Sequence, residues 1–137
     1  MTNSLGDQWL SCVRVTARMN QAVERALSER HNLCVSAYEV MDVMWHERGW
    51  IRSGELSSRS SRSQPQVSRL LTQMADAGYA ARKPSPGDGR GSLVQLTPSG
   101  RALFREASAT VEDVLADLTA ENADAGALMR SAVPQAG

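Results

Sequence analysis

One stretch of the chain pairs an amphipathic helix with a glycine-rich loop, and this combination restricts the possible folds more than any other feature. The segment "SQPQVSRLLTQMADAG" predicts the helix, because Ser63 can cap its N-terminus, Pro65 falls in its first turn and Gly78 permits a left-handed stop. Apolar residues at helical spacing give it one buried face: Val67, Leu70, Leu71 and Met74. The opposite face is polar and carries a positive charge: Gln66, Ser68, Arg69, Thr72 and Gln73.

A β-hairpin is predicted directly after this helix. Residues 79–83 and 92–96 each predict a strand, and alternation turns Val94 and Leu96 inward. The intervening "PSPGDGRG" is too long for a two-residue turn and therefore predicts a projecting loop. Thr97 and Pro98 then suit the N-cap and the first position of another helix.

The sequence before this segment predicts further helices. Apolar residues at helical spacing give a long helix from about Leu5 to Arg30. Ser36 is expected to cap the second helix, with Glu39 completing a Ser-x-x-Glu capping box and Gly49 ending the helix. A short, weak helix around Leu56 is expected over about 52–60.

After the hairpin, an apolar stripe extends the helix that begins at Pro98, and a poorer helix, interrupted by Gly126, covers about 120–133. The expected order is long helix, helix, short helix, polar-faced helix, hairpin, long helix, short helix. This order predicts a mostly α fold with a small β-hairpin wing, a winged helix-turn-helix. In such a fold a helix reads the major groove of DNA and the hairpin tip enters the adjacent minor groove.

The net charge of zero conceals an uneven distribution of charge along the chain. Residues 48–105 carry ten basic side chains and three acidic ones, a balance of +7, and the rest of the chain has a balance of −7. A basic middle between acidic flanks favours binding of a polyanion. The alternative is a chance clustering of charges on solvated faces.

Length and composition restrict the classes of protein to which the chain can belong. With 137 residues, 42% of them hydrophobic, the chain predicts one globular domain. The sequence shows no membrane-spanning run and no signal-peptide core, and Cys12 and Cys34 lack metal-ligand spacing, which predicts a cytoplasmic protein with reduced thiols. His31 and His46 also lack such spacing, and no catalytic motif stands out, so we expect no metal, no cofactor and no enzymatic activity.

The segment "QVSRLLTQMADAGYAARKPSPGDGRGSLVQLTPSGRALF" resembles the MarR family of bacterial transcriptional regulators. The likeness rests on Val-Ser-Arg in the recognition helix, Ala-Gly before the wing, Asp-x-Arg within the wing and Leu-Thr-x-x-Gly after it. The resemblance implies one domain over residues 1–137, with a DNA-binding region over about 36–97 and dimerisation helices over about 5–31 and 98–133. It further implies a homodimer on a pseudo-palindromic operator, usually a repressor that a ligand or an oxidant releases.

The resemblance also implies roles for individual residues. Arg90 is expected at the wing tip in the minor groove, and Asp88 is expected to hold the wing in shape. Arg82 and Lys83 are expected to touch phosphates at the base of the wing. The expected DNA-binding residues on and before the recognition helix are Ser63, Gln64, Gln66, Ser68, Arg69, Thr72 and Gln73.

The segment "SSRSSRS" departs from the family pattern, because it is more hydrophilic than usual. It predicts a loosely held short helix and turn. Alternatively, its two arginines, Arg59 and Arg62, add phosphate contacts.

Two further features allow more than one interpretation. The first is a cluster of side chains that forms either a pocket for a small anionic or aromatic effector or ordinary helix packing. Its members are Arg14, Arg18, Tyr38, Asp42, Trp45 and His46. Cys12 lies on an apolar stripe, which favours a buried structural thiol over a redox sensor, and Cys34 is expected to be inert. A winged-helix module that binds protein and not DNA is the main alternative function.

Overall fold

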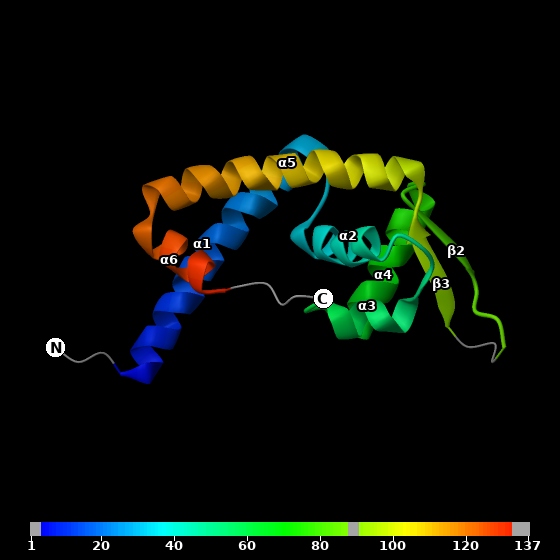
Figure 1. The fold of residues 1–137 in the computed structure, drawn as a ribbon, viewed down its shortest axis with the longest axis horizontal. Coiled ribbons are helices and arrows are strands. Elements are labelled where there is room, and N and C mark those ends of the chain that lie inside the picture. The colour runs from blue at the N-terminus through cyan, green and yellow to red at the C-terminus, as the bar shows by residue number, and fades with distance from the viewer. Residues whose placement is uncertain (1–3, 88–90, 133–137) are drawn as a thin grey trace. The chain divides into compact units, whose positions relative to one another are not determined.

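The computed structural model describes residues 4–87 and 91–132 of the chain. It is mostly helical and has one small sheet (Figure 1). The elements, in chain order, are α1 (Leu5–His31), α2 (Val35–Glu47), β1 (Ile51–Arg52), α3 (Ser53–Arg59), α4 (Gln64–Asp76), β2 (Ala80–Pro84), β3 (Ser92–Leu96), α5 (Pro98–Glu121) and α6 (Ala123–Ser131).

The chain forms two compact units. The first contains the described residues of Met1–Asn32 and Ala109–Gly137, and the second is Leu33–Ser108. The start of α5 therefore belongs to the unit that contains the predicted winged helix-turn-helix. In the part of the chain that the structure describes, no helix combines the length and the apolar character needed to cross a membrane.

In the first unit, α6 packs against α1. The long first helix is confirmed: the Ser4 hydroxyl accepts a hydrogen bond from the Asp7 N–H at 3.1 Å, and Asn32 ends the helix in the left-handed conformation. The prediction that Gly126 interrupts the last helix is wrong. The break lies earlier, at Asn122, whose side chain caps α6, and Gly126 is buried within α6.

In the second unit, both predicted ends of α2 are wrong. The N-cap is Cys34 and not Ser36: the Cys34 Sγ accepts a hydrogen bond from the Ala37 N–H at 3.4 Å. At the other end, Gly49 was expected to end the helix, but α2 ends at Glu47 and Arg48 is its C-cap, in the left-handed conformation with φ of 61°. Glu39 therefore has no capping role, which leaves its carboxylate available for other contacts.

The polar-faced helix α4 forms as predicted. Ser63 caps it, and a capping box joins the side chains and backbone N–H groups of Ser63 and Gln66. Gly78 follows the helix with φ of 84°, in the left-handed region that glycine adopts at low cost. The four residues of the predicted apolar face are all buried: Val67, Leu70, Leu71 and Met74.

The sheet has three antiparallel strands in the order β1-β3-β2. Strands β2 and β3 form the predicted hairpin, in a register that pairs Ala80 with Leu96, and Val94 and Leu96 are buried as expected. The two-residue β1 was not predicted. Its Ile51 pairs with Val94 and is buried, which fixes the start of α3 to the sheet.

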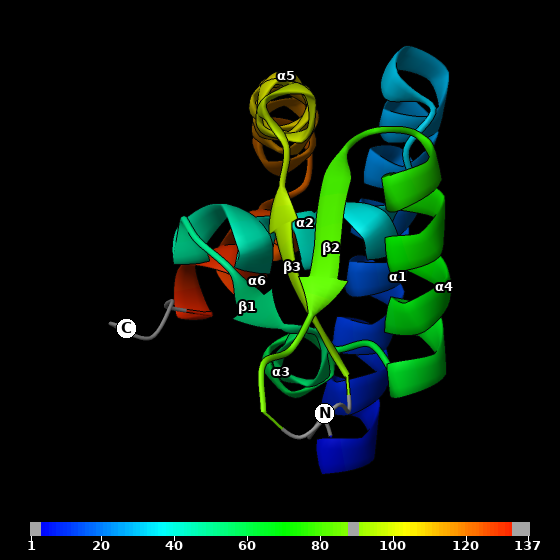
Figure 2. The same cartoon turned by 90° about the vertical axis from the view of Figure 1, so that its right-hand side faces the viewer.

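The start of α5 is joined closely to the end of α4. The Thr97 hydroxyl donates to the Gly78 carbonyl at 2.6 Å and accepts from the Gly100 N–H at 3.1 Å. Gly100 lies so close to the backbone of Tyr79 that an added Cβ atom would stand 2.0 Å from the Tyr79 carbonyl oxygen. The Thr-Pro-x-Gly sequence is thus a packing requirement at this junction. Figure 2 shows the resulting winged helix-turn-helix, with α4 and the hairpin side by side.

Candidate nucleic-acid interface

The predicted recognition face of α4 is exposed to solvent. Ser68, Arg69, Thr72 and Gln73 all lie on it, opposite the buried apolar face. No hydrogen bond or ion pair engages the Arg69 or Gln73 side chain among the described residues. Side chains that extend from a rigid helix without internal partners are available for hydrogen bonds to base edges or phosphates.

The residues at the start of α4 are engaged in building the helix. The Gln66 Oε1 accepts from the Ser63 N–H at 3.2 Å, and the Ser63 hydroxyl accepts from the Gln66 N–H at 3.4 Å. The Gln64 amide is hydrogen bonded to Ser57 Oγ, in α3. An amide carries two further N–H donors beyond its oxygen, so Gln66 can hold the cap and still donate to a ligand.

The base of the wing is attached to α4 through side chains. The Arg82 Nη1 donates to Thr72 Oγ1 at 3.3 Å, and both residues are exposed. Lys83 Nζ lies 4.3 Å above the ring of Trp50, a cation–π contact. The first contact places the Arg82 cation beside the recognition helix, and the second holds Lys83 against Trp50, just before β1. The predicted wing residues Asp88 and Arg90 lie outside the described residues.

Glu39 holds the turn that precedes the recognition helix. Its carboxylate accepts hydrogen bonds from the Ser61 N–H at 2.7 Å, from the Ser61 hydroxyl at 2.8 Å and from Arg62 Nε at 2.9 Å. Burial by itself raises the pKa of Glu39, but the hydrogen bonds from Ser61 and the hydrogen bond and charge of Arg62 outweigh it and hold this pKa below its ordinary value of 4.5. The expectation of a loosely held turn is therefore wrong.

The two arginines of this segment have acidic partners within the protein. Arg62 is paired with Glu39, and Arg59 Nη1 lies 2.9 Å from Glu47 Oε2 and 3.9 Å from Glu55 Oε2. Their charges are largely neutralised by these carboxylates, which weakens the interpretation of Arg59 and Arg62 as additional phosphate contacts. Sequence reasoning missed these pairs because the partners lie 12 and 23 positions away along the chain.

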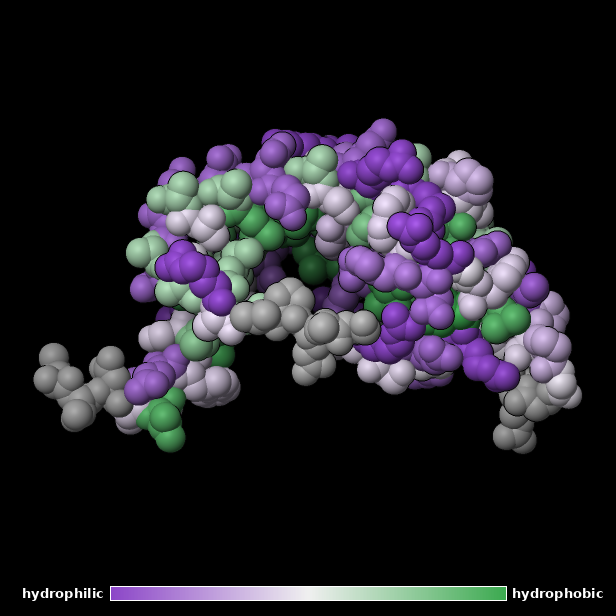
Figure 3. Space-filling model, in the orientation of Figure 1, coloured by the Kyte–Doolittle hydropathy of each residue, from purple (hydrophilic) through white to green (hydrophobic). Residues whose placement is uncertain are grey.

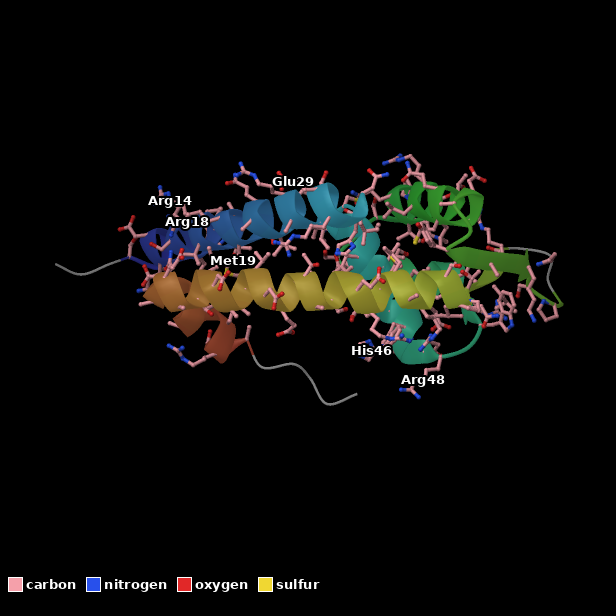
Figure 4. All side chains as sticks on the ribbon, turned by 90° about the horizontal axis from the view of Figure 1, so that it is seen from above. Arg14, Arg18, Met19, Glu29, His46 and Arg48 are labelled. Carbon is pink, nitrogen blue, oxygen red and sulfur yellow. The ribbon has the colours of Figure 1, made fainter. Side chains whose placement is uncertain are left out.

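The residues of the predicted effector pocket lie in both units. In the second unit, the Tyr38 ring stacks on Phe104 at 5.0 Å, and Trp45 lies between Phe104 at 5.2 Å and the Arg101 guanidinium at 4.3 Å. His46 Nδ1 bonds to the Asp42 carbonyl at 2.8 Å, in the same helix. Arg14 and Arg18 are exposed on α1, in the first unit, and Figure 4 shows both extending outward from that helix. The pocket therefore stays a prediction.

The expectation that Cys12 is buried is wrong. Cys12 is exposed in this chain, whereas Cys34 is partly buried at the start of α2. The reason is that the apolar stripe of α1 continues beyond the part that the rest of the chain covers: Val15 is buried, but Trp9 and Val13 are 65% and 44% exposed. In the described part of the chain, no three His, Cys, Asp or Glu side chains are grouped to hold a metal ion.

Residues 35–91 match the sequence model described as the MarR family. A curated relative, an uncharacterized HTH-type transcriptional regulator from Mycobacterium leprae, is 32% identical over 85 residues, which cover 61% of this chain and 59% of the relative. The chain thus spans 59% of the length of that relative.

Solved structures share the fold along nearly the whole chain. A mutant MarR from E. coli in complex with operator DNA superposes with a TM-score of 0.72 and 24% identity, over 96% of this chain and 100% of that one. CouR from Rhodococcus jostii RHA1, bound to p-coumaroyl-CoA, superposes with a TM-score of 0.77 and 20% identity, over 95% and 91% of the two chains. The family match over residues 35–91, which is less than half of the chain, and the winged helix-turn-helix that contains them make this chain similar to the MarR family.

Proposed function

We propose that this chain is a sequence-specific regulator of transcription that binds double-stranded DNA as a homodimer. The observation that carries the proposal is the two-faced helix α4, whose apolar side is buried and whose polar side presents Arg69, Thr72 and Gln73 to solvent. The DNA-bound structure of the E. coli MarR mutant shares this fold and supports the same use of the helix here.

The wing extends the same surface with positive charge. Arg82 and Lys83 are exposed on β2, and Arg82 is hydrogen bonded to Thr72 of α4. We propose that α4 enters the major groove while Arg82 and Lys83 contact the flanking phosphates, with Arg90 reaching the minor groove and Asp88 supporting it. Ser63, Gln64, Gln66 and Ser68 complete the proposed contact set at the start of α4.

The exposed apolar side chains of the first unit support dimerisation. Soluble proteins seldom expose several large apolar side chains close together unless a partner covers them. The N-terminal half of α1 and the end of α6 expose Leu5, Trp9, Leu10, Val13 and Met129. Figure 3 shows hydrophobic side chains at the N-terminal end of α1. A second copy of the chain is the proposed partner, which would present two α4 helices to the two halves of a pseudo-palindromic operator.

A small-molecule effector that releases the DNA is the proposed control. CouR, which shares the fold, is bound to p-coumaroyl-CoA in its structure. In this chain the aromatic rings of Tyr38 and Trp45, with Arg101 stacked on Trp45, offer apolar faces beside a positive charge. An anionic aromatic ligand suits these groups, and Asp42 and His46, in the same unit, are the other proposed contacts.

The test is selection of bound duplexes from random DNA, followed by binding measurements over a range of salt concentrations. We expect a pseudo-palindrome and an affinity that falls steeply with salt, with a logarithmic slope of about 0.9 for each phosphate contact. Arg69→Ala is expected to weaken binding at least tenfold, whereas Arg25→Ala, on the exposed side of α1, leaves it unchanged. Absent or salt-independent binding to every duplex would favour a protein-binding module.

A further inference from the structure

An open pocket lies between the start of the recognition helix and the base of the wing. It has a volume of about 390 Å³, and none of its lining residues except Gln64 belongs to the predicted DNA-binding set. The lining comes from β1, α3, the first residue of α4 and the residues that flank the wing loop: Arg52, Ser53, Gly54, Glu55, Gln64, Ser85, Gly91 and Ser92. Figure 2 shows α3 beside the ends of the β2 and β3 strands at which this loop begins and ends.

Ser85 is the feature of this pocket that calls for a ligand. The residue is only 5% exposed, and its hydroxyl is fully buried with no hydrogen-bond partner among the described residues. Buried hydroxyl groups almost always have a partner, so the unsatisfied hydroxyl that lines this pocket calls for one, such as a water molecule or a ligand oxygen. The structure thus provides a desolvated hydroxyl with unused hydrogen-bonding capacity at this position.

The other lining groups supply matching chemistry. Ser53 and Ser92 add two hydroxyl groups, and Gly54 and Gly91 leave the backbone accessible because they have no side chain. The Arg52 side chain is exposed and forms no ion pair among the described residues. Hydroxyl donors beside one unpaired guanidinium form a suitable set for a tetrahedral oxyanion, whose oxygens accept several hydrogen bonds at once.

One acidic residue, Glu55, also lines the pocket. Its carboxylate lies 3.9 Å from the Arg59 guanidinium, which compensates its charge in part. The negative charge of Glu55 lowers the affinity of the pocket for an anion. Removal of this charge is therefore expected to strengthen anion binding, which can be tested.

We infer that this pocket binds a phosphate group through Ser85, Ser92, Ser53 and Arg52. Two sources share this chemistry: a phosphodiester of the DNA backbone, and a free phosphate or phosphorylated small molecule. The assignment to a DNA phosphodiester rests on the proposed function. The location of the pocket favours a DNA phosphodiester, because the pocket lies between the two elements that are proposed to contact DNA. One phosphate would then be held between the helix and the wing.

The first experiment titrates the full chain with inorganic phosphate, without DNA, and follows backbone amide resonances by NMR. We expect saturable shifts centred on Ser85, Gly91 and Ser92. Ser85→Ala and Arg52→Gln are expected to weaken phosphate binding at least fivefold, and Glu55→Gln is expected to strengthen it. The matched controls Ser99→Ala and Arg25→Gln, both at exposed helix positions, leave it unchanged.

Stability measurements distinguish loss of binding from loss of fold. Removal of a buried, unsatisfied hydroxyl, as in a serine-to-alanine substitution, leaves the free energy of unfolding unchanged or raises it. Ser85→Ala is therefore expected to unfold at the same or a higher denaturant concentration than the wild type while it binds phosphate less well. If Ser85→Ala and Arg52→Gln bind phosphate as the wild type does, or if the wild type shows no saturable shifts, the inference is overturned for free phosphate.

The second experiment measures the affinity of the same variants for a selected duplex. If the phosphate comes from DNA, Ser85→Ala and Arg52→Gln lower the affinity at least fivefold, and Arg52→Gln also reduces the salt slope by about one. Normal duplex binding with impaired phosphate titration assigns the pocket to a free phosphate compound. If both variants bind phosphate and the duplex as the wild type does, phosphate binding in this pocket is rejected and the proposed function stands. Saturable phosphate binding by a chain that binds no duplex rejects the proposed function and retains the pocket.

Discussion

The Glu39 carboxylate accepts hydrogen bonds from both the N–H and the hydroxyl of Ser61, at 2.7 and 2.8 Å. The two residues are 22 positions apart, and their contact joins the middle of α2 to the turn between α3 and α4. A helix-turn-helix depends on a fixed angle between its helices, and here a single acidic side chain holds the turn that sets this angle.

The first prediction concerns the pH dependence of this contact. The pKa of Glu39 in the folded chain lies below its ordinary value of 4.5, so its stabilising effect is complete above that value and is lost as the pH falls through the folded pKa. Glu39→Ala is expected to lower the free energy of unfolding by about 1–2 kcal/mol at pH 7, a figure reduced for solvent screening of a half-buried group. The difference from the wild type narrows at acidic pH. Urea denaturation at several pH values measures it, with exposed Glu112→Gln as the control; a difference that does not change between pH 7 and pH 3 would contradict the assignment.

The second prediction concerns the cap of α2. The Cys34 Sγ accepts from the Ala37 N–H, and a serine hydroxyl accepts such a bond better than a thiol does. Cys34→Ser is therefore expected to keep or slightly raise the stability, whereas Cys34→Ala costs about 0.5–1 kcal/mol. Ser36→Ala serves as the control and is expected to change little. Thermal unfolding distinguishes the two positions; a larger loss in Ser36→Ala than in Cys34→Ala would restore Ser36 as the cap.

The third prediction concerns Gly100. Any side chain there meets the Tyr79 carbonyl oxygen, which belongs to the backbone and cannot rotate away. Gly100→Ala is expected to destabilise the chain by about 2–3 kcal/mol or more, as overpacking does in other cores. Gly49→Ala is the matched control, because an added Cβ atom at Gly49 meets nothing within 4 Å. Equal denaturation midpoints for the two variants would contradict this prediction, because they would show that the Tyr79 backbone can move away from Gly100 without loss of stability.

The fourth prediction concerns the exposed apolar side of α1. A charge placed among apolar side chains that a second copy covers would be buried without a partner, which is costly. Val13→Asp is therefore expected to yield monomers in sedimentation and light-scattering measurements and to weaken binding to a full operator at least tenfold. Gln21→Asp, at an exposed polar position of the same helix, is expected to leave the dimer intact. A wild-type chain that sediments as a monomer at high concentration would exclude the proposed dimer.

The parts of the fold that could be predicted are those with strong local signals. The apolar face of α4 repeats at helical spacing between a serine cap and a glycine stop, and the alternation around Val94 places β3 in the core. Each of these signals lies within a few residues, so periodicity and capping rules suffice. The same signals placed the polar face of α4, with Arg69, on the outside.

The features that could not be predicted depend on distant partners or on very short elements. Glu39 had a plausible local role as a capping residue, and only the fold brings it to Ser61 and Arg62. Strand β1 has two residues, too few to show any alternation, and it exists because β3 provides a partner. Ser85 carries no sequence signal, because the burial of its hydroxyl depends on the folded chain and not on its neighbours in the sequence.

The Thr97 hydroxyl, which contacts both the Gly78 carbonyl and the Gly100 N–H, gives this fold a mechanical property. One side-chain oxygen joins the glycine that follows α4 to the first turn of α5, although the β2–β3 hairpin lies between them along the chain. Within the second unit, a displacement of the first turn of α5 would therefore be transmitted directly to the C-terminal end of α4, the helix proposed to contact DNA.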